Sequence, residues 1–438
     1  MRGRAVMWFR RDLRVHDQPA LLAAAATGPS GLTCLYVLDD RLLGGPDASP
    51  RRIDFLLGSL RALAGELERR GSRLEVRRGR PEVVVPAVAE STRAEAVFVS
   101  RDAAPFTHRR DAGVEAGLGR LGVPLVALPG LHVHEVGTIR TAGGGPYRVF
   151  GPFWRAWGPA PLRPVQPAPA SLPPPVGPDR ATGAWPRHAL ASESQGGPAL
   201  HGASAVPGPG EPEARRRLEA WSADGLAGFA DRHGGLDVAA SSGLSAALRF
   251  GLVSPVEVVA LARRAAPPAD AAAFARQLAW RDFYAELWAR GTGTAGADRI
   301  DSAWRADPAG VEAWLAGRTG YPLVDAAMRQ LSATGWLPNR ARLVAASFLV
   351  KDLLVDWRVG ERLFRRLLVD GDPASDVGNW RWVAGDGPDA APWWRILDPV
   401  RQAERFDPGG DYVRRWLPEL ADVPDAWLAR PWTMPLDV

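Results

Sequence analysis

The stretch DGDPASDVGNWRW, from Asp370 to Trp382, places three carboxylates and two tryptophans close together in the chain. Trp380 and Trp382 would share a face of a strand but not of a helix, because side chains alternate across a strand. Buried carboxylates are costly unless they are paired or bind a ligand. We therefore interpret this stretch as part of a binding site and not as plain core.

Two further segments combine polar and aromatic residues at helical spacing. In SSGLSAAL, from Ser241 to Leu248, small hydroxyl residues precede an apolar helix, which suits either an ordinary N-cap or a site for phosphate. In FARQLAWRDFYAEL, the side chains of Gln277, Arg281 and Tyr284 can share one helix face. Such a face suits a binding cavity, and a helix–helix contact is the alternative.

A third segment, GYPLVDAAMRQLSATGWLPNRARLVAASFLVKDLLVDW, contains a predicted helix start at Pro338. Arg342 would lie one turn after Asn339. Asp370 and Asp372 are natural partners for a buried Arg342, because an unpaired buried charge is expensive.

The first 130 residues show an alternation of strand-like and helix-like segments. Short apolar runs alternate with helical segments through the first 130 residues, which predicts a doubly wound parallel sheet. The predicted strands are Ala5–Phe9, Leu32–Leu38, Leu74–Val76, Ala96–Ser100 and Pro124–Leu128, with helices including Ser49–Arg70 and Pro81–Glu90. The chain reads RRDLRVHD after the first strand, so the Gly-rich dinucleotide fingerprint is missing.

Composition divides the chain into three parts. We expect an α/β domain over residues 1–130, a long Pro/Gly-rich connection over 131–212, and an all-α domain over 213–438. Almost all of the candidate chemistry falls in the helical part.

Composition also limits the function classes. No apolar run reaches the ~18 residues of a membrane span, and arginines interrupt the first residues where a signal peptide would be apolar, so we expect a cytoplasmic enzyme. Cys34 is the only cysteine, which excludes disulfides within the chain and thiolate metal sites. The net charge of +5 is compatible with a nucleic-acid partner, although composition bias explains it equally well. Bias does not explain 18 Trp against 5 Tyr.

Several long segments in order resemble the photolyase/cryptochrome family. They are WFRRDLRVHD, SSGLS, LAWRDFY, TGYPLVDAAMRQL, NRARLVAASFLVKDLLVDWR and the Asp370–Trp382 stretch. The resemblance extends from the first strand to about Leu420 and is greatest for microbial class I cyclobutane pyrimidine dimer photolyases. It implies a deoxyribodipyrimidine photo-lyase whose helical domain binds FAD. Photoexcited reduced FAD would pass an electron to a pyrimidine dimer in DNA, the cyclobutane ring would split, and the electron would return.

The resemblance also implies roles for individual residues. The expected FAD contacts are Phe229, Ser241, Ser242, Gly243, Leu244, Ser245, Arg281, Arg342, Asp370, Asp372 and Asp376, with Arg342 and Asp370 as an ion pair. The expected electron path to the flavin is Trp304, Trp357 and Trp380. The expected DNA or lesion contacts are Arg232, Gln277, Trp280, Asn339, Arg340, Leu343, Trp382, Arg395 and Gln402. Photolyases are a known example of base-flipping enzymes, so an extruded dimer stacking on Trp280 and Trp382 comes with the resemblance.

Five positions depart from the dimer photolyases. Gln277 replaces a Glu that bonds the lesion, Leu343 replaces a Met, and Pro338 replaces a common His. Phe229 replaces a Tyr near FAD, and Asp376 replaces an Asn near flavin N5. We assign Gln277 and Asp376 to the catalytic set.

The departure at Asp376 keeps an alternative function open. An ionised Asp376 would repel anionic reduced flavin and its pKa would rise, whereas a protonated Asp376 could donate a proton at the flavin. Asp at this position resembles plant-type cryptochromes, so the alternative is a blue-light photoreceptor with little or no repair. The end of the chain soon after the core, without a long signalling tail, favours repair.

Two other functions fit less well. A non-catalytic DNA-binding protein would require loss of the flavin site, which the sequence does not show. Repair of (6-4) photoproducts would call for His at two positions that are Pro338 and Arg342.

The N-terminal domain of the family can hold an antenna chromophore. The stretch RDAAPFTHRRD, from Arg101 to Asp111, lacks the Asn-Glu pair associated with folate. We therefore prefer an 8-hydroxy-5-deazaflavin type over folate, with an empty site also open. We expect a monomer whose partner is DNA containing pyrimidine dimers, with no membrane or metal.

Overall fold

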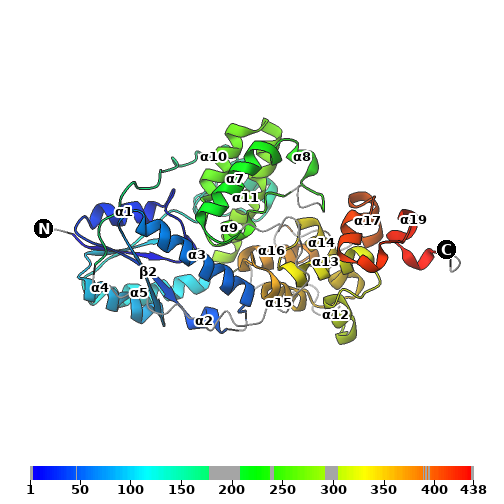
Figure 1. Ribbon diagram of the computed structural model, residues 1–438, viewed down its shortest axis with the longest axis horizontal. Helices are drawn as coiled ribbons and strands as arrows, with labels where there is room; N and C mark the ends of the chain where they lie inside the picture. Colours follow the sequence, from blue (N-terminus) through cyan, green and yellow to red (C-terminus); the bar gives the residue numbers. More distant parts are fainter. Residues whose placement is uncertain are drawn as a thin grey trace.

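The structure, a computed structural model, describes residues 3–45, 47–176, 208–236, 241–291, 304–387, 389, 392 and 395–435. An α/β part containing the N-terminus packs against a helical part that extends to the C-terminus at the opposite end of the molecule (Figure 1). The predicted combination of an α/β domain and an all-α domain is confirmed.

The α/β part is built on a five-stranded parallel sheet with the strand order β3-β2-β1-β4-β5. All five predicted strands are present: β1 (Ala5–Phe9), β2 (Leu32–Leu38), β3 (Leu74–Arg78), β4 (Ala96–Ser100) and β5 (Leu125–Leu128). Every residue of β1 and β4 is buried, as expected for parallel strands covered on both faces. The chain order reverses between β1 and β4, and at such a point in α/β sheets the carboxyl ends of the strands form a crevice.

Helices accompany this sheet and the connection that follows it. They are α1 (Pro19–Thr27), α2 (Asp40–Leu43), α3 (Pro50–Glu68), α4 (Pro81–Thr92), α5 (Pro105–Gly119) and, within the expected connection, α6 (Phe150–Trp157). Helices α3 and α4 correspond to the two that were predicted. Proline in the first turn begins most of them, because its fixed φ suits a helix start and its missing N–H is not needed there.

The helical part begins at α7 (Glu211–Ala220). Its other α-helices are α8 (Phe229–Arg232), α9 (Ser245–Arg249), α10 (Pro255–Ala265), α11 (Pro268–Ala289), α12 (Pro308–Leu315), α13 (Pro322–Thr334), α14 (Asn339–Ser347), α15 (Trp357–Leu367), α16 (Pro373–Ala384), α17 (Pro399–Phe406), α18 (Asp411–Trp416) and α19 (Asp425–Leu428). Short π turns span Trp221–Gly225 and Phe348–Asp352, and 3-10 turns span Pro418–Leu420 and Pro431–Thr433.

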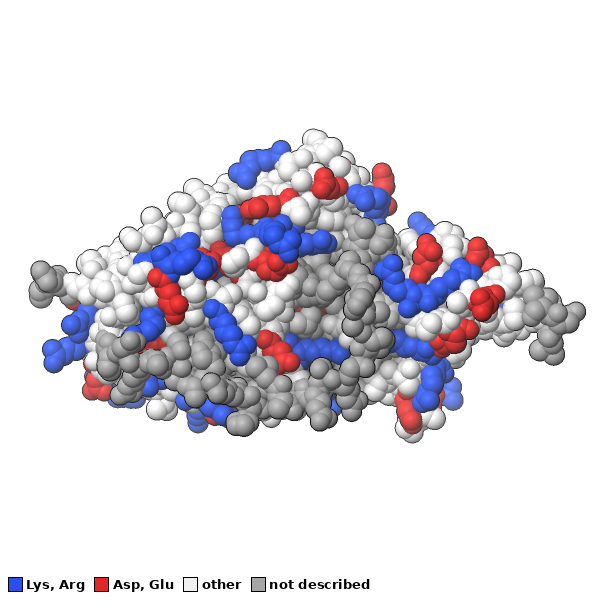
Figure 2. Space-filling view, in the orientation of Figure 1, with Lys and Arg blue, Asp and Glu red and all other residues white. Residues whose placement is uncertain are grey.

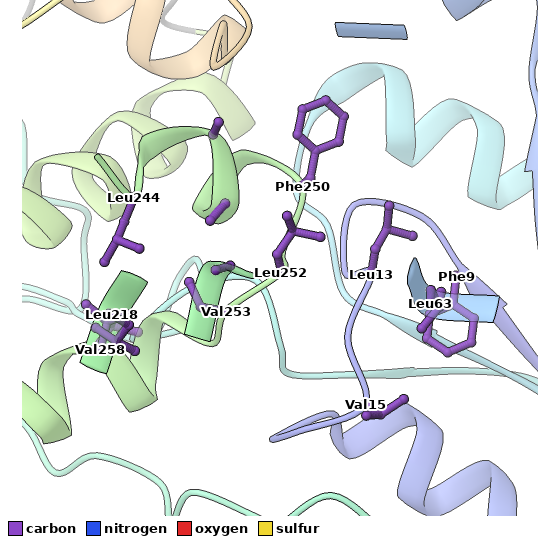
Figure 3. Packing of buried hydrophobic residues seen from close by; sticks show 14 of the residues in the cluster. Phe9, Leu13, Val15, Leu63, Leu218, Leu244, Phe250, Leu252, Val253 and Val258 are labelled. Carbon is purple, nitrogen blue, oxygen red and sulfur yellow. The ribbon is translucent and has the colours of Figure 1, made fainter. Parts of the chain in front are cut away.

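The two parts share one hydrophobic core. Side chains from the sheet domain, such as Phe9 and Leu13, belong to the same buried cluster as Phe250 and Leu252 from the helical part (Figure 3). The backbone amide of Leu13 donates to the carbonyl of Phe250 at 3.1 Å. Gly251 has a φ of +63°, and a methyl group there would collide with the backbone of the loop after β1. The loop after β1 is therefore fixed directly against the helical part.

A second core lies within α12 to α18. Trp314, Leu349, Trp357 and Trp380 are among its buried members, and Trp304 packs at its edge. Among the helices of the described ranges, none combines the length and apolar character needed to cross a bilayer.

Candidate active site

The stretch that begins at Asp370 forms the turn into α16. Asp372 is the N-cap residue, and its side chain accepts a hydrogen bond from the amide of Ser375 at 3.2 Å. Because the segment is helical, Trp380 is buried in the second core while Trp382, two residues later, is only partly buried. The residues of this stretch therefore lie in different surroundings, with Asp372 capping a helix, Trp380 in the core and Trp382 near the surface.

The predicted ion pair between Arg342 and Asp370 is confirmed. Nη2 of Arg342 donates to Oδ2 of Asp370 at 2.7 Å, and Nε donates to the carbonyl of Leu337 at 2.9 Å. The Asp370 side chain is 2% exposed, so its charge depends on this partner. Pro338 precedes α14 as its N-cap residue, which confirms the predicted helix start and places Arg342 in the first turns.

Asp372 has a different partner from the one expected. Its Oδ2 lies 2.8 Å from Nη1 of Arg11, in the loop after β1, and 4.0 Å from Nε of Arg249. Burial alone would raise the pKa of Asp372, but the charges of Arg11 and Arg249 outweigh burial and lower it to about 2. The expectation that Asp372 would pair with Arg342 was wrong, because an arginine from the other domain takes its place.

Asp376 is the third carboxylate of the stretch, and among the described residues no arginine or lysine forms an ion pair with it. Burial raises its pKa well above the ordinary value, and the neighbouring charges of Asp372 and Asp370 raise it further against the opposing effect of Arg342. The pKa is raised, as expected, but burial and the two neighbouring acids raise it, whereas the expectation rested on the charge of the reduced flavin. The raised pKa favours the neutral form of Asp376.

Two oxygen atoms of this turn are buried without a hydrogen-bond partner, namely Oδ1 of Asp370 and Oδ2 of Asp376. Buried polar atoms are nearly always hydrogen-bonded, so unpartnered ones call for a ligand or solvent. The acceptor oxygen of Asp370, which is paired with Arg342, and the carboxyl group of Asp376, whose raised pKa favours the neutral form, suit a ring system with N–H and carbonyl edges. The isoalloxazine ring of FAD is such a group, and these residues fit it.

The serine segment forms turns rather than a helix cap. The Oγ atoms of Ser241 and Ser242 accept from the amides of Gly243 and Leu244, each at 3.3 Å. Helix α9 begins at Ser245 without a side-chain cap, so the ordinary N-cap interpretation was wrong. Ser245 is exposed, and its Oγ accepts from Nε1 of Trp336 at 3.2 Å.

Helix α11 presents its predicted residues to different surroundings. Gln277 is exposed and reaches only the carbonyl of Ala273 in its own helix, at 3.4 Å. Arg281 donates to the carbonyl of Leu131 at 2.6 Å, in the connection between the domains. Burial lowers the pKa of Arg281, and the nearby charge of Arg11 contributes. Within the described residues, the carboxylate nearest to the Arg281 guanidinium is Asp282, at 4.0 Å.

Trp280 on the same helix is covered on one face by Phe150 of α6. Their ring centroids are 3.5 Å apart and the rings are inclined by 8°. Stacking on Phe150 holds the indole in a fixed orientation, and part of its surface remains exposed.

The three tryptophans of the expected electron path differ in depth. Trp380 is 3% exposed and packs edge-on against Phe364, with ring centroids 5.1 Å apart. Trp357 is 7% exposed, and Trp304 is partly buried. The amide of Arg305 donates to the carbonyl of Leu354 at 2.8 Å, which places the Trp304 segment beside the loop before Trp357. The order from buried to partly exposed is compatible with the path, which stays a prediction.

The expected DNA-contacting residues fall into a connected group. Arg340 donates to Oε1 of Gln402 at 3.2 Å and to the carbonyl of Gly234, two residues after Arg232, at 3.3 Å. Arg395 is exposed and lies 5.6 Å from the ring centroid of Trp382.

Positive charge gathers in this group. Burial lowers the pKa of Arg340, and the charges of Arg405 and Arg395 lower it further, so three guanidinium groups lie close together. Basic side chains also occur along the face shown in Figure 2, interspersed with acidic ones. Asn339 and Arg232 are exposed, and Leu343 is partly buried. Phe229 is buried and packs edge-on against Trp221 and Phe274.

Sequence reasoning missed several residues that position the site. Arg217 donates to the carbonyls of Ser241 and Ser242, at 3.2 and 2.8 Å, and Arg249 donates to the carbonyl of Gly371 at 2.8 Å. Arg11 and Phe150 were missed as well. None carries a local signal, because each acts on residues distant in the chain.

A doubly wound α/β domain, packed on helices whose buried carboxylates fit a flavin, defines the class of two-domain flavin-binding proteins. Comparison with known proteins identifies the family. Residues 5–174 match the model of DNA photolyase, and residues 274–438 match that of the FAD binding domain of DNA photolyase. The chain belongs to the photolyase/cryptochrome family.

Individual relatives agree with this assignment. A deoxyribodipyrimidine photo-lyase of Streptomyces griseus is 40% identical, over 98% of this chain and 92% of that protein. A class III photolyase of Agrobacterium tumefaciens has a TM-score of 0.89 at 35% identity, over 100% of this chain and 91% of that one. A cryptochrome of Synechocystis has a TM-score of 0.88 at 28% identity, over 99% and 92% of the two chains.

Proposed function

We propose that this protein repairs cyclobutane pyrimidine dimers in DNA in a light-dependent reaction that uses FAD. Two features found together in a chain of this family carry the proposal. Asp370 and Asp376 have buried oxygens without a hydrogen-bond partner, and basic and aromatic side chains gather around Trp382 and Arg340. The first feature suits the cofactor and the second suits a damaged nucleic acid. The relative from Streptomyces griseus is named for the same activity.

FAD, when bound, reduced and excited by light, supplies an electron that opens the cyclobutane ring of the dimer and takes it back afterwards. The protein holds and orients the reacting groups. Arg342 holds Asp370 in place as an acceptor, and the raised pKa of Asp376 favours the neutral form, which can donate a hydrogen bond. The segment from Ser241 to Ser245 would contact the FAD phosphates, as the family resemblance implies. Trp304, Trp357 and Trp380 would relay an electron from the surface inward.

The basic and aromatic group would bind DNA around the lesion. Arg340, Arg395 and Arg232 would contact phosphates, which position the duplex without reading its sequence. Trp280 and Trp382 offer partly exposed indoles on which an extruded dimer can stack. Repair of genomic DNA takes place in the compartment that holds the DNA, which agrees with the prediction of a cytoplasmic protein. The prediction of a monomer is kept as part of this proposal.

An antenna chromophore would occupy the α/β domain. A recess next to the carboxyl ends of β1 and β4 is lined by Arg11, Asp102 and His132 and also by Arg281 and Asp372, so it borders the expected FAD site and does not mark a separate antenna site. Burial lowers the pKa of His132 to about 3, aided by the charges of Arg281 and Arg11, so this imidazole is neutral and can accept a hydrogen bond. A deazaflavin type remains our preferred occupant.

The decisive experiment measures dimer splitting by purified, photoreduced protein on an oligonucleotide containing one thymine dimer, with the flavin spectrum recorded in the same cuvette. Light-dependent loss of the dimer, absent in the dark, is the expected result. Normal photoreduction of the flavin without loss of the dimer would overturn the proposal and leave the photoreceptor function.

A further inference from the structure

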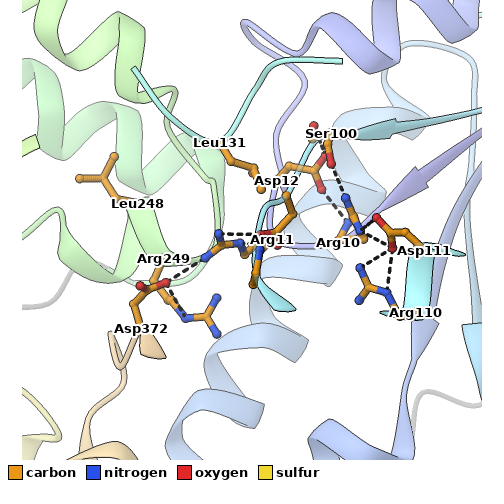
Figure 4. Close-up of polar contacts among 12 residues, drawn as sticks. Arg10, Arg11, Asp12, Ser100, Arg110, Asp111, Leu131, Leu248, Arg249 and Asp372 are labelled. Atoms are coloured by element: carbon orange, nitrogen blue, oxygen red, sulfur yellow. Dashed lines mark hydrogen bonds and ion pairs between the residues drawn. The ribbon is translucent and has the colours of Figure 1, made fainter. Parts of the chain in front are cut away.

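One guanidinium group connects the two domains at the candidate flavin site. Nε and Nη2 of Arg11 donate to the two carboxylate oxygens of Asp102, at 2.9 and 3.2 Å, within the α/β domain. Nη1 of Arg11 donates to Asp372 of the helical domain at 2.8 Å. Figure 4 shows the Arg11 side chain lying between the loop after β1 and Asp372. Planar, multidentate contacts of this kind fix geometry as well as charge.

The backbone around Arg11 is also fixed against the helical domain. Its carbonyl lies so close to Gly251 that only glycine fits there. Two residues later, the amide of Leu13 bonds the carbonyl of Phe250. The Arg11 side chain therefore starts from a defined position and is not a flexible surface arginine.

Asp372 in turn supports the turn that carries the other two carboxylates. It caps α16 through the amide of Ser375, while Arg249 bonds the carbonyl of Gly371 from the other side. Asp370 precedes this cap, and Asp376 follows in the first turn of the helix. A displacement of Asp372 would move both.

Charge balance points the same way. Arg342 neutralises Asp370, Arg11 is the cation bonded to Asp372, and Arg249 is farther away at 4.0 Å. Without Arg11, the buried Asp372 would lose the cation it bonds at 2.8 Å, and among the described residues only the more distant Arg249 and Arg281 would offset its charge. An anionic group bound nearby would feel that charge strongly, because buried charges are little screened.

We propose that Arg11, a residue of the α/β domain, is a positioning residue of the FAD site, holding Asp372 in place and setting the charge presented to the flavin by the turn at Asp370–Asp376. This inference rests on the proposed binding of FAD by these carboxylates. It gives the α/β domain a role in the redox chemistry of the helical domain that is separate from holding an antenna.

The test measures the midpoint potential of the bound flavin by spectroelectrochemistry in FAD-loaded wild type and variants. Arg11→Met removes the cation and keeps an apolar stem. Reduced, anionic flavin should then bind about tenfold less tightly relative to oxidised flavin, which lowers a two-electron midpoint by about 30 mV. The double variant R11M/D372N removes both charges and should return the potential toward that of the wild type. Arg11→Gln, which can still donate to Asp372, serves if R11M does not fold, and its potential should shift in the same direction.

Arg51→Gln is the matched control. Arg51 also bonds across the domains, to the carbonyls of Leu331 and Ser332, but does not contact the carboxylate turn. An unchanged potential in the folded Arg11 variant, or the same shift in R51Q, would overturn the inference.

The outcome is separable from that of the proposed function. A shifted potential in R11M together with no dimer repair by the wild type would contradict the repair proposal but not the role of Arg11. Repair by the wild type with an unshifted potential in R11M would contradict the role of Arg11 but not the repair proposal.

Discussion

At the scale of single residues, Asp376 is a carboxyl group whose neutral form the folded protein favours. Its pKa is raised above the ordinary 3.8, so folding disfavours its charged form. The wild type should therefore lose stability as the pH rises from about 4 toward the folded-state pKa. Asp376→Asn cannot ionise and should not show this loss. The melting temperature of D376N minus that of the wild type should increase by about 2 °C or more between pH 5 and pH 8, measured by thermal denaturation.

Asp422→Asn provides the control for this pH series, because Asp422 is exposed in a turn near the C-terminus. Its difference from the wild type should stay constant with pH. A constant difference for D376N as well would show that Asp376 is ionised in the folded protein.

Asp370 differs from Asp376 because it forms a buried ion pair with Arg342. Arg342→Met leaves Asp370 buried without its cation and should lower the free energy of unfolding by about 3 kcal/mol. The double variant R342M/D370N should recover much of that loss. The pair Arg358–Asp356 is the control because its side chains are more exposed, at 34% and 29%, and R358M should cost less than about 1 kcal/mol. Equal losses in R342M and R358M, by urea denaturation, would contradict this account.

Sequence reasoning worked for pairs whose chemistry leaves few alternatives. Arg342 and Asp370 could be matched because a buried arginine needs an acid. The raised pKa of Asp376 was expected only from the charge of the reduced flavin, and the effect of Asp372 and Asp370 was not foreseen. Arg11 could not be matched to Asp372, since contacts between distant parts of a chain leave no local pattern. An N-cap was one of two roles that the sequence left open for the serine hydroxyls, and it was wrong because the same residue types also form turns before helices.

At the scale of elements, the distance between α11 and α16 depends on Gly378. A methyl group there would collide with the ring of Tyr284 on α11. The two helices carry Trp280 and Trp380, so their spacing sets the shape of the site. Gly378→Ala should lower the free energy of unfolding by about 2 kcal/mol and reduce the fraction of protein that retains FAD.

The matched control for this packing effect is Gly119→Ala at the end of α5. No described atom lies within 4 Å of a methyl group at Gly119. G119A should change stability by less than about 1 kcal/mol, with either sign. FAD retention equal to that of the wild type in G378A would show that the helices can separate without altering the site.

Helix α6 contributes to the site through Phe150, although it lies in what the sequence presents as a connection. Phe150→Ala removes the ring stacked on Trp280 and frees the indole to turn. Affinity for dimer-containing oligonucleotide should fall about threefold to tenfold, since aromatic pairs are worth about 0.5–1.5 kcal/mol. Affinity for undamaged DNA should not change. Phe150→Leu, which fills space without stacking, should give the same loss, and unchanged lesion affinity in both variants would remove Phe150 from the site.

The elements themselves were largely predictable. The five strands follow from short apolar runs, as expected for parallel strands buried on both faces, and helices α3 and α4 follow from helical periodicity. Helix α6 was missed because the Pro- and Gly-rich composition that follows it led us to assign the whole of residues 131–212 to a connection. Its functional contact with Trp280 is a product of tertiary packing.

At the scale of the whole molecule, the two domains share a core, so they should unfold together. Phe250 lies at the end of α9 and packs against Phe55 of α3, with ring centroids 5.0 Å apart. Phe250→Ala should cost about 3 kcal/mol because it leaves a cavity at the domain boundary. Hydrogen exchange should then quicken by the same factor in peptides from β1 and in peptides from α13, which lie in different domains. Val83→Ala is the control, because Val83 is 67% exposed, and it should leave exchange unchanged. Faster exchange confined to one domain would show that the α/β domain folds independently, and the bond from Arg11 to Asp372 would then connect two separable bodies.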